Sequence, residues 1–226
     1  MWAWRPVWGW VAVAVVVLVV GLGGPVVLRE RASARYPVTA DDLAAGRAEL
    51  AALVVTEQIG EAPYDRDRFG TAWADVDANG CDTRNDVLRR DLSATTVDVD
   101  ACTVLTGVLD DPYTGRRIAF TRGAHSADVQ IDHVVALADA WSSGAAGWDA
   151  RTREAFANDP ANLLAVDGDA NQDKGAADAA QWLPPDPGYT CVYALRQIRV
   201  KHAYGLGVTS DERRALAAAL GTCAVV

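Results

Sequence analysis

The sequence predicts an α+β fold, rich in helices, in a single domain that follows an apolar N-terminal segment. Apolar residues recur at helical spacing near both ends of the chain after residue 34, and β-branched runs lie between them. Four widely spaced cysteines could close two disulfides within the same region. The length of 226 residues suits one domain of ordinary size plus an appendage.

Residues 1–34 are predicted to be either a signal peptide or an N-terminal membrane anchor. Half of the eight tryptophans lie in this segment, and Pro6–Leu28 carries no charged residue. An uncharged run of this length reaches across a bilayer as a helix, whereas Ala32–Ser33–Ala34 offers the small residues of a signal-peptide cleavage site. Both interpretations predict that residues 35–226 are extracellular or at the cell surface. A membrane would be contacted only through residues 6–28, if they are not cleaved.

The first half of the exported part is expected to contain helices and then strands. Thr39–Ile59 predicts a helix, because Thr39 is a suitable N-cap, an apolar stripe follows it, and Gly60 would end it. Residues 64–92 are expected to be helical in pieces. The β-branched residues that follow predict strands within Thr95–Leu109 and over Arg116–Thr121, separated by a turn at 111–115.

The second half is expected to contain two further apolar strands and several helices. The strands are predicted in Val129–Val135 and Asn162–Val166. Two prolines at 184 and 185 would end one helix, and Thr209 with Glu212 forms a capping box that opens the last one. The helices are expected at Leu137–Trp141, Arg151–Ala157, Ala170–Trp182, Cys191–Tyr204 and Thr209–Leu220.

The cysteines predict two disulfides rather than a metal site. No CxxC pair is present, so a zinc site is poorly supported. In an oxidising compartment the four residues would pair in one of three ways. We favour Cys81–Cys102 and Cys191–Cys223, because each of these pairs closes a short loop.

The charge of the chain argues against one class of partner. The formal net charge is −9, whereas proteins that bind nucleic acid through a polybasic surface need positive charge for their phosphate contacts. The composition also excludes a collagenous, coiled-coil or multi-span membrane protein.

Three short segments carry the residues suited to chemistry. Asp132 and His133 lie at the end of a predicted strand, where neighbouring side chains point to opposite faces. Asn162 begins the next strand, and Asn171 and Lys174 lie at the start of the helix that follows. Carboxylate and amide oxygens suit Mg²⁺ or Mn²⁺, whereas a lysine suits an anion such as phosphate.

This ordered set resembles the ββα-metal (His-Me finger) core of HNH endonucleases. The wider sequence is similar to exported actinobacterial-type HNH proteins related to the GmrSD C-terminal nuclease domain, from about Tyr64 to Cys223. The matching segments are Asn79–Arg84, Asp111–Gly115, Ile131–His133, Trp182–Pro185 and Val200–Leu206. The resemblance implies that residues 35–226 are an HNH endonuclease-like domain built around a ββα-metal core. It implies a nucleic-acid substrate, with DNA favoured over RNA, and no protein partner.

The resemblance also implies a role for each matched residue. His133 corresponds to the general base that takes a proton from the attacking water. Asp132 and Asn171 correspond to the ligands of a single divalent metal, Mg²⁺ or Mn²⁺. Asn162 corresponds to the asparagine that braces the loop between the strands and orients the histidine. The long interval between His133 and Asn162 implies an inserted helical excursion over Leu137–Asp159.

Two basic residues are predicted to contact substrate phosphate, and simpler interpretations stay open. Lys174 is placed by its position in the motif, and Arg84 because its guanidinium matches the geometry of a phosphate. A salt bridge to a nearby aspartate is an alternative for Arg84. Asn171 could be a helix cap, and Asp132 with His133 could be a structural pair.

A second function is suggested by the segment from Asp75 to Asp86. Asp75, Asp77, Asn79 and Gly80 follow much of a calcium-loop pattern, with Asp86 at the twelfth position in place of the usual glutamate. The alternative to an endonuclease is therefore a non-catalytic, calcium-stabilised extracellular module with a degenerate HNH core. A structural turn is the simpler interpretation of this segment.

Overall fold

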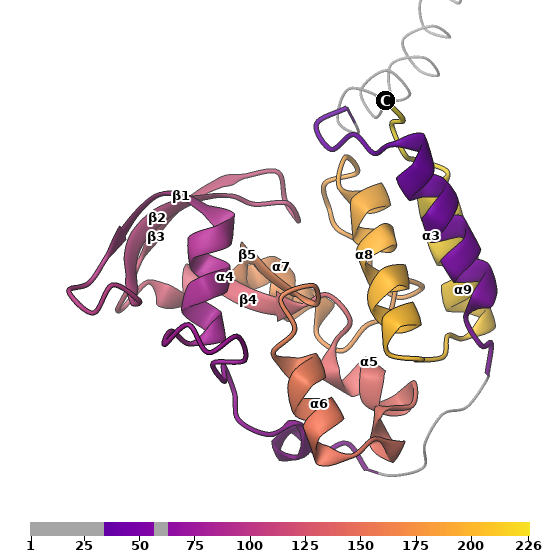
Figure 1. Cartoon of the computed structure of the whole chain (residues 1–226). Coiled ribbons are helices and arrows are strands. Elements are labelled where there is room, and N and C mark those ends of the chain that lie inside the picture. Colours follow the sequence, from indigo (N-terminus) through magenta and orange to yellow (C-terminus); the bar gives the residue numbers. More distant parts are fainter. Residues whose placement is uncertain (1–33, 57–62) are drawn as a thin grey trace, which may run out of the picture.

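A computed structural model describes residues 34–56 and 63–226 (Figure 1). Nearly all of the predicted signal peptide or anchor therefore lies outside the described residues, including 6–28. Within those two ranges, no helix is long and apolar enough to cross a membrane. The described residues therefore give the expected transmembrane segment no support. The α+β prediction is confirmed in a single domain.

Helices at the two ends of the described chain pack together into one layer. Thr39 and Thr209 cap two of them, because their hydroxyl oxygens accept hydrogen bonds from the backbone amides of Asp42 and Glu212. A shared apolar cluster lies between the three helices, and the Cys191–Cys223 disulfide ties the second to the segment after the third. The helices are α3 (Ala40–Ala52), α8 (Thr190–Ala203) and α9 (Ser210–Leu220).

The first helix ends earlier than its apolar stripe predicts. Leu53 is extended and ends α3, and Val54 is 68% exposed instead of packing in the stripe. The backbone beyond it pairs with Val208, whose amide donates to the Val54 carbonyl and whose carbonyl accepts from the amide of Thr56. Tertiary hydrogen bonds therefore replace the last helical turns, and the predicted stop at Gly60 lies outside the described residues.

A three-stranded antiparallel sheet lies on the other side of the molecule from this helical layer (Figure 1). The predicted run Thr95–Leu109 divides into two strands because residues 98–103 turn between them. The Cys81–Cys102 disulfide fastens this turn to the start of the helix beside it, so both predicted disulfides are confirmed. The elements are α4 (Thr83–Asp91), β1 (Leu92–Val97), β2 (Val104–Asp110) and β3 (Arg117–Thr121).

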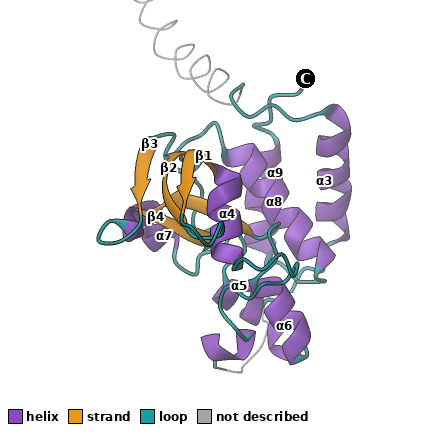
Figure 2. Ribbon diagram, turned by 60° about the vertical axis from the view of Figure 1, so that its left-hand side comes forward, coloured by secondary structure: helices purple, strands orange, loops and turns teal. Residues whose placement is uncertain are grey.

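A two-stranded antiparallel ribbon and a short helix lie between the sheet and the helical layer in the view of Figure 1, and the turned view of Figure 2 shows them below the sheet. All five residues of the second strand are buried, with alternate side chains in two different apolar clusters. The predicted excursion separates the two strands and contains two α-helices, with a short 3-10 helix (Ala145–Gly147) between them. The elements are β4 (Val129–His133), α5 (Leu137–Ser142), α6 (Ala150–Ala157), β5 (Leu163–Asp167) and α7 (Gly168–Lys174).

Glycines fix both ends of α7. At Gly168 a Cβ atom would lie 2.1 Å from the Ala127 carbonyl oxygen, so no larger residue fits there. Gly175 has φ +51°, a left-handed conformation that ends the helix. The predicted helix over Ala170–Trp182 is therefore too long at its C-terminal end.

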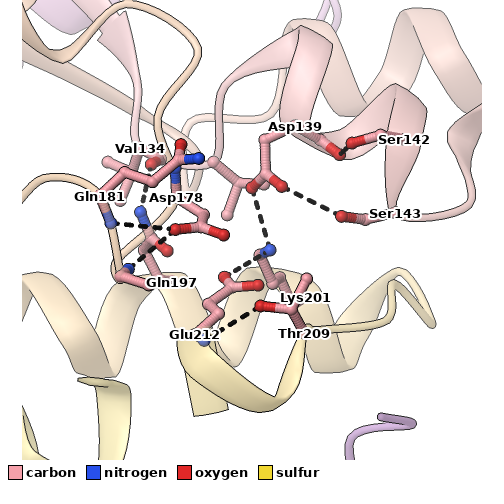
Figure 3. Close-up of polar contacts among 12 residues, drawn as sticks. Val134, Asp139, Ser142, Ser143, Asp178, Gln181, Gln197, Lys201, Thr209 and Glu212 are labelled. Carbon is pink, nitrogen blue, oxygen red and sulfur yellow. Dashed lines mark hydrogen bonds and ion pairs between the residues drawn. The ribbon is translucent and has the colours of Figure 1, made fainter. Parts of the chain in front are cut away.

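A buried group of charges joins three helices (Figure 3). The ammonium of Lys201 on α8 lies 2.9 Å from Asp139 on α5 and 2.6 Å from Glu212 on α9. Burial raises the pKa of Glu212 to about 7 against the opposing effect of Lys201, and the carboxylates of Asp139 and Asp178 add to the increase. Glu212 therefore titrates near neutral pH inside the fold.

This arrangement predicts how stability depends on pH. The folded pKa of Glu212 lies above its ordinary 4.5, so its contribution to the free energy of unfolding is complete below pH 4.5 and is lost as the pH rises through 7. Between pH 5 and pH 8, the free energy of unfolding of the wild type should fall because Glu212 ionises. We expect this fall to be smaller in Glu212→Gln, by up to about 3 kcal/mol. Urea unfolding at a series of pH values measures it. Equal pH dependence in the variant and the wild type would contradict the assignment.

Candidate active site

The end of the β4–β5–α7 unit opens into a cavity of about 330 Å³. Asp132 and His133, from the end of β4, line it together with Asn171 from α7. Three residues that the sequence placed in one site therefore lie around one cavity. The remaining lining includes Tyr64, Arg66, Gln130, Ala136, Leu137, Ala138, Gln172, Gly175 and Ala176.

His133 is held as a neutral imidazole. Its Nε2 atom lies 2.8 Å from the carbonyl oxygen of Ala157, and a neutral ring in this contact carries its proton on Nε2 and a lone pair on Nδ1. Burial lowers the pKa of His133 to about 4 against the opposing effect of the Ala157 carbonyl, and the charges of Arg66 and Lys174 lower it further. The ring is therefore a proton acceptor at neutral pH.

Asp132 is buried and bonded at both carboxylate oxygens. Oδ1 lies 2.9 Å from the ammonium of Lys174, and Oδ2 accepts a 2.5 Å hydrogen bond from the hydroxyl of Tyr113. Burial raises the pKa of Asp132, and Lys174 and Tyr113 oppose this increase. The carboxylate thus joins β4 to α7 and to the turn between β2 and β3.

Lys174 is too deeply buried for the phosphate contact that the sequence predicts. Its side chain is 0% exposed, and its ammonium donates to Asp132 and to the backbone carbonyl of His133. Because both contacts are internal, the charge of Lys174 serves to hold the unit together, not to bind a phosphate on the surface.

The two asparagines hold different parts of the site. Asn171 donates from Nδ2 to Oε1 of Gln130 at 2.9 Å, so its side-chain oxygen, not its nitrogen, is the atom that could bind a metal. Asp167, not Asn171, caps α7, so the helix-cap interpretation is wrong. The buried side chain of Asn162 accepts from the amide of Val135 at 2.8 Å and donates to its carbonyl at 3.2 Å, which ties down the chain that follows His133.

Arg84 lies away from this cavity, and a different arginine lines it. Arg84 is half-buried in the first turn of α4, with Nη1 buried and without a hydrogen-bond partner. Burial and the nearby Arg122 lower its pKa, and its phosphate contact stays a prediction. Arg66, which sequence reasoning missed, is exposed and lines the cavity beside His133. Only its basic character in an alternating Asp-Arg run could have pointed to it.

The donor atoms around the cavity suit a hard divalent cation. The parts of the chain that the structure covers hold no cluster of three or more His, Cys, Asp or Glu that could bind a metal, so a metal at this cavity would also need amide or water oxygens as ligands. Asp132 and Asn171 both offer oxygen atoms, and the two hydrogen bonds of Asp132 use about half of the four acceptor sites of a carboxylate. Mg²⁺ commonly keeps several waters, so two protein ligands fit it.

The carboxylates of the calcium-loop pattern are used within their own turn. Asp75 accepts hydrogen bonds from the amides of Asn79 and Gly80, while Asp77 and Asp86 accept from Asn79. The hydrogen bonds show that these acidic residues stabilise the turn before α4.

Comparison with known proteins identifies the family. Residues 82–219 match the model of the family described as GmrSD restriction endonucleases, C-terminal domain. The chain belongs to this family. The matched region contains β4, β5 and α7, together with all the residues of these elements that line the cavity. The domain is therefore of a nuclease family. An uncharacterized secreted protein of Arthroderma benhamiae is 42% identical over 177 residues, which cover 77% of this chain and 82% of that protein. No solved structure matches the chain.

The position of Lys174 yields a stability prediction that separates its two roles. Lys174→Met leaves the Asp132 carboxylate buried without its cation, so we expect the free energy of unfolding to fall by about 3–5 kcal/mol. Urea unfolding measures the loss. Arg117→Met, at an exposed position on β3, is the control and should change stability by no more than about 0.5 kcal/mol. If the Lys174 variant were as stable as the control, the ion pair would not hold the unit together, and a phosphate contact would again be the better explanation of Lys174.

Proposed function

We propose that this protein is a metal-dependent endonuclease that hydrolyses phosphodiester bonds of nucleic acid, with DNA as the favoured substrate and RNA as the alternative. The observation that carries the proposal is the neutral His133 at a cavity also lined by Asp132 and Asn171. A base and two oxygen ligands around one space are the groups that hydrolysis of a phosphate diester requires. The membership in a nuclease family supports the same conclusion.

In this mechanism His133 is the general base. Its Nδ1 atom takes a proton from a water molecule while the water oxygen bonds to phosphorus, and the bond from phosphorus to the leaving sugar oxygen breaks. Asp132 and Asn171 would hold one divalent ion, Mg²⁺ or Mn²⁺, which supplies stabilisation of the negative charge on the phosphate and the leaving oxygen. Arg66 binds a phosphate oxygen at the mouth of the same cavity.

Asn162 acts in this mechanism by positioning. Its side chain bonds to both the amide and the carbonyl of Val135. The amide of Val134 also donates to the backbone carbonyl of Asn162. The chain directly after His133 therefore has one conformation, which keeps the imidazole at the cavity without a contact between Asn162 and the substrate.

The charge of the chain sets the expected mode of substrate binding. A net charge of −9 opposes long-range attraction of nucleic acid, so binding depends on contacts at the site and weakens as salt concentration rises. A bound divalent ion and Arg66 make one local positive region on an acidic surface.

The proposed location is outside the cell. Two disulfides are stable in an oxidising compartment, and the relative from Arthroderma benhamiae is described as secreted. We propose that residues 35–226 form the exported nuclease domain and that the segment before them directs export.

Loss of the base should abolish most of the activity. We expect His133→Ala to lower the rate of plasmid nicking in Mg²⁺ or Mn²⁺ by about 10²- to 10⁴-fold. His125→Ala removes an exposed histidine that pairs with Asp128 outside the cavity and should leave the rate unchanged. A His133 variant that nicks DNA within a few-fold of the wild type would show that the base is assigned to the wrong residue.

Loss of an oxygen ligand should change the metal requirement. We expect Asn171→Ala to raise the concentration of Mn²⁺ that gives half of the maximal nicking rate by at least about tenfold. The measurement is a metal titration of the wild type, of Asn171→Ala and of Asn79→Ala, whose side chain lies in the turn before α4. A requirement unchanged in the first variant, or changed equally in both, speaks against Asn171 as a ligand.

A further inference from the structure

His133 also contacts an aromatic ring that the proposed mechanism does not use. The indole of Trp73 lies with its centroid 6.2 Å from that of the imidazole, and the two planes differ by 17°. Aromatic pairs in proteins commonly have such separations. Both rings line a second cavity of about 90 Å³, distinct from the one that contains Asp132 and Asn171. Trp73 therefore lies beside the imidazole at a cavity that Asp132 and Asn171 do not line.

The backbone holds Trp73 in a conformation that it would not adopt alone. Its φ of +60° lies in the left-handed region, which is strained for a bulky side chain. Asn158 bonds to the chain on both sides of it, donating to the carbonyl of Thr71 at 3.1 Å and accepting from the amide of Ala74 at 3.0 Å. The amide of Thr83 donates to the carbonyl of Trp73 itself. These bonds offset the strain and fix the indole.

Asn158, which holds the backbone on both sides of Trp73, directly follows Ala157, which bonds to the imidazole of His133. Ala157 accepts the hydrogen bond from Nε2 of His133, and the fully buried Asn158 follows it directly in the chain. The two neighbouring residues Ala157 and Asn158 therefore both act on His133. Ala157 bonds to the imidazole directly, and Asn158 holds the tryptophan whose ring stacks with it. Neither contact involves the groups proposed to bind a metal.

We propose that Trp73, held by Asn158, is a positioning residue that keeps the His133 ring in the orientation in which Nε2 donates to Ala157 and Nδ1 stays the basic atom. The inference rests on the proposed function, in which His133 is the general base. Because the two planes are nearly parallel, rotation of the imidazole about its χ2 angle would drive its edge toward the indole. The indole therefore resists the exchange of the two ring nitrogens.

A purely structural role for Trp73 makes a different prediction. Trp73 also packs at the margin of the apolar cluster that contains Val87 and Leu88, so its truncation lowers stability in either case. Trp73→Met keeps much of the apolar volume and removes the flat face, whereas Trp73→Phe keeps a face. Trp148 packs against Phe156 and Tyr204, not against His133, so Trp148→Met is the matched control.

The test measures activity and ring geometry separately in the full chain. Below the melting temperatures of all variants, we expect Trp73→Met to lower kcat for plasmid nicking in Mn²⁺ by about 10- to 100-fold, with KM within about threefold of the wild type. Trp73→Phe should recover most of kcat, and Trp148→Met should keep it. Long-range ¹⁵N–¹H spectra of the imidazoles, assigned with His133→Gln, should show the proton on Nε2 in the wild type and a mixed state in Trp73→Met.

The outcomes separate this inference from the proposed function. Unchanged kcat and an unchanged His133 ring spectrum in Trp73→Met overturn the positioning role even if the wild type is an active nuclease. A loss of kcat that Trp73→Phe fails to recover, or that Trp148→Met shares, also overturns it. If the wild type cleaves neither DNA nor RNA with any divalent metal, the proposed function fails, and the spectra alone then decide whether Trp73 orients His133.

Discussion

The buried ion pair between Lys174 and Asp132 is the interaction on which the site depends. It joins the last residue of α7 to β4, and the same ammonium also bonds to the carbonyl of His133. Tyr113 completes the set from the turn between β2 and β3. Two charges removed from water are tolerable only while they remain paired. The strand, the helix and the backbone of the proposed base are therefore held together by one group of polar contacts.

The excursion between β4 and β5 gives the site its second support. Its end and the residues that lead into β5, 157–162, hold the imidazole through the Ala157 carbonyl, the Trp73 segment through Asn158 and the chain after His133 through Asn162. Arg196 on α8 donates to the carbonyl of Ala161 in this stretch and to that of Leu163 at the start of β5. The long interval between the histidine and Asn162 thus contains a folded unit that returns the chain to the site.

Burial decides the charge state of the groups at the site more than the charge of the whole chain does. His133 is kept neutral chiefly because its imidazole is desolvated, and Lys174 is neutralised by Asp132 inside the fold. Arg66 is the exposed cation among the residues that line the cavity. An acidic protein can therefore carry a site for an anionic substrate, because the attraction is local.

The sequence by itself determined the class of the fold, the order of most elements, the two disulfides and the set Asp132, His133 and Asn171, which meets at one cavity. Such features depend on local spacing, turn residues and a motif of fixed order. Tertiary structure decided where α3 and α7 end, what Lys174 binds, and that Arg66 and Trp73 lie beside His133. Each of these follows from contacts between residues far apart in the chain, and the spacing of residues within a segment carries no information about which distant segment packs against it.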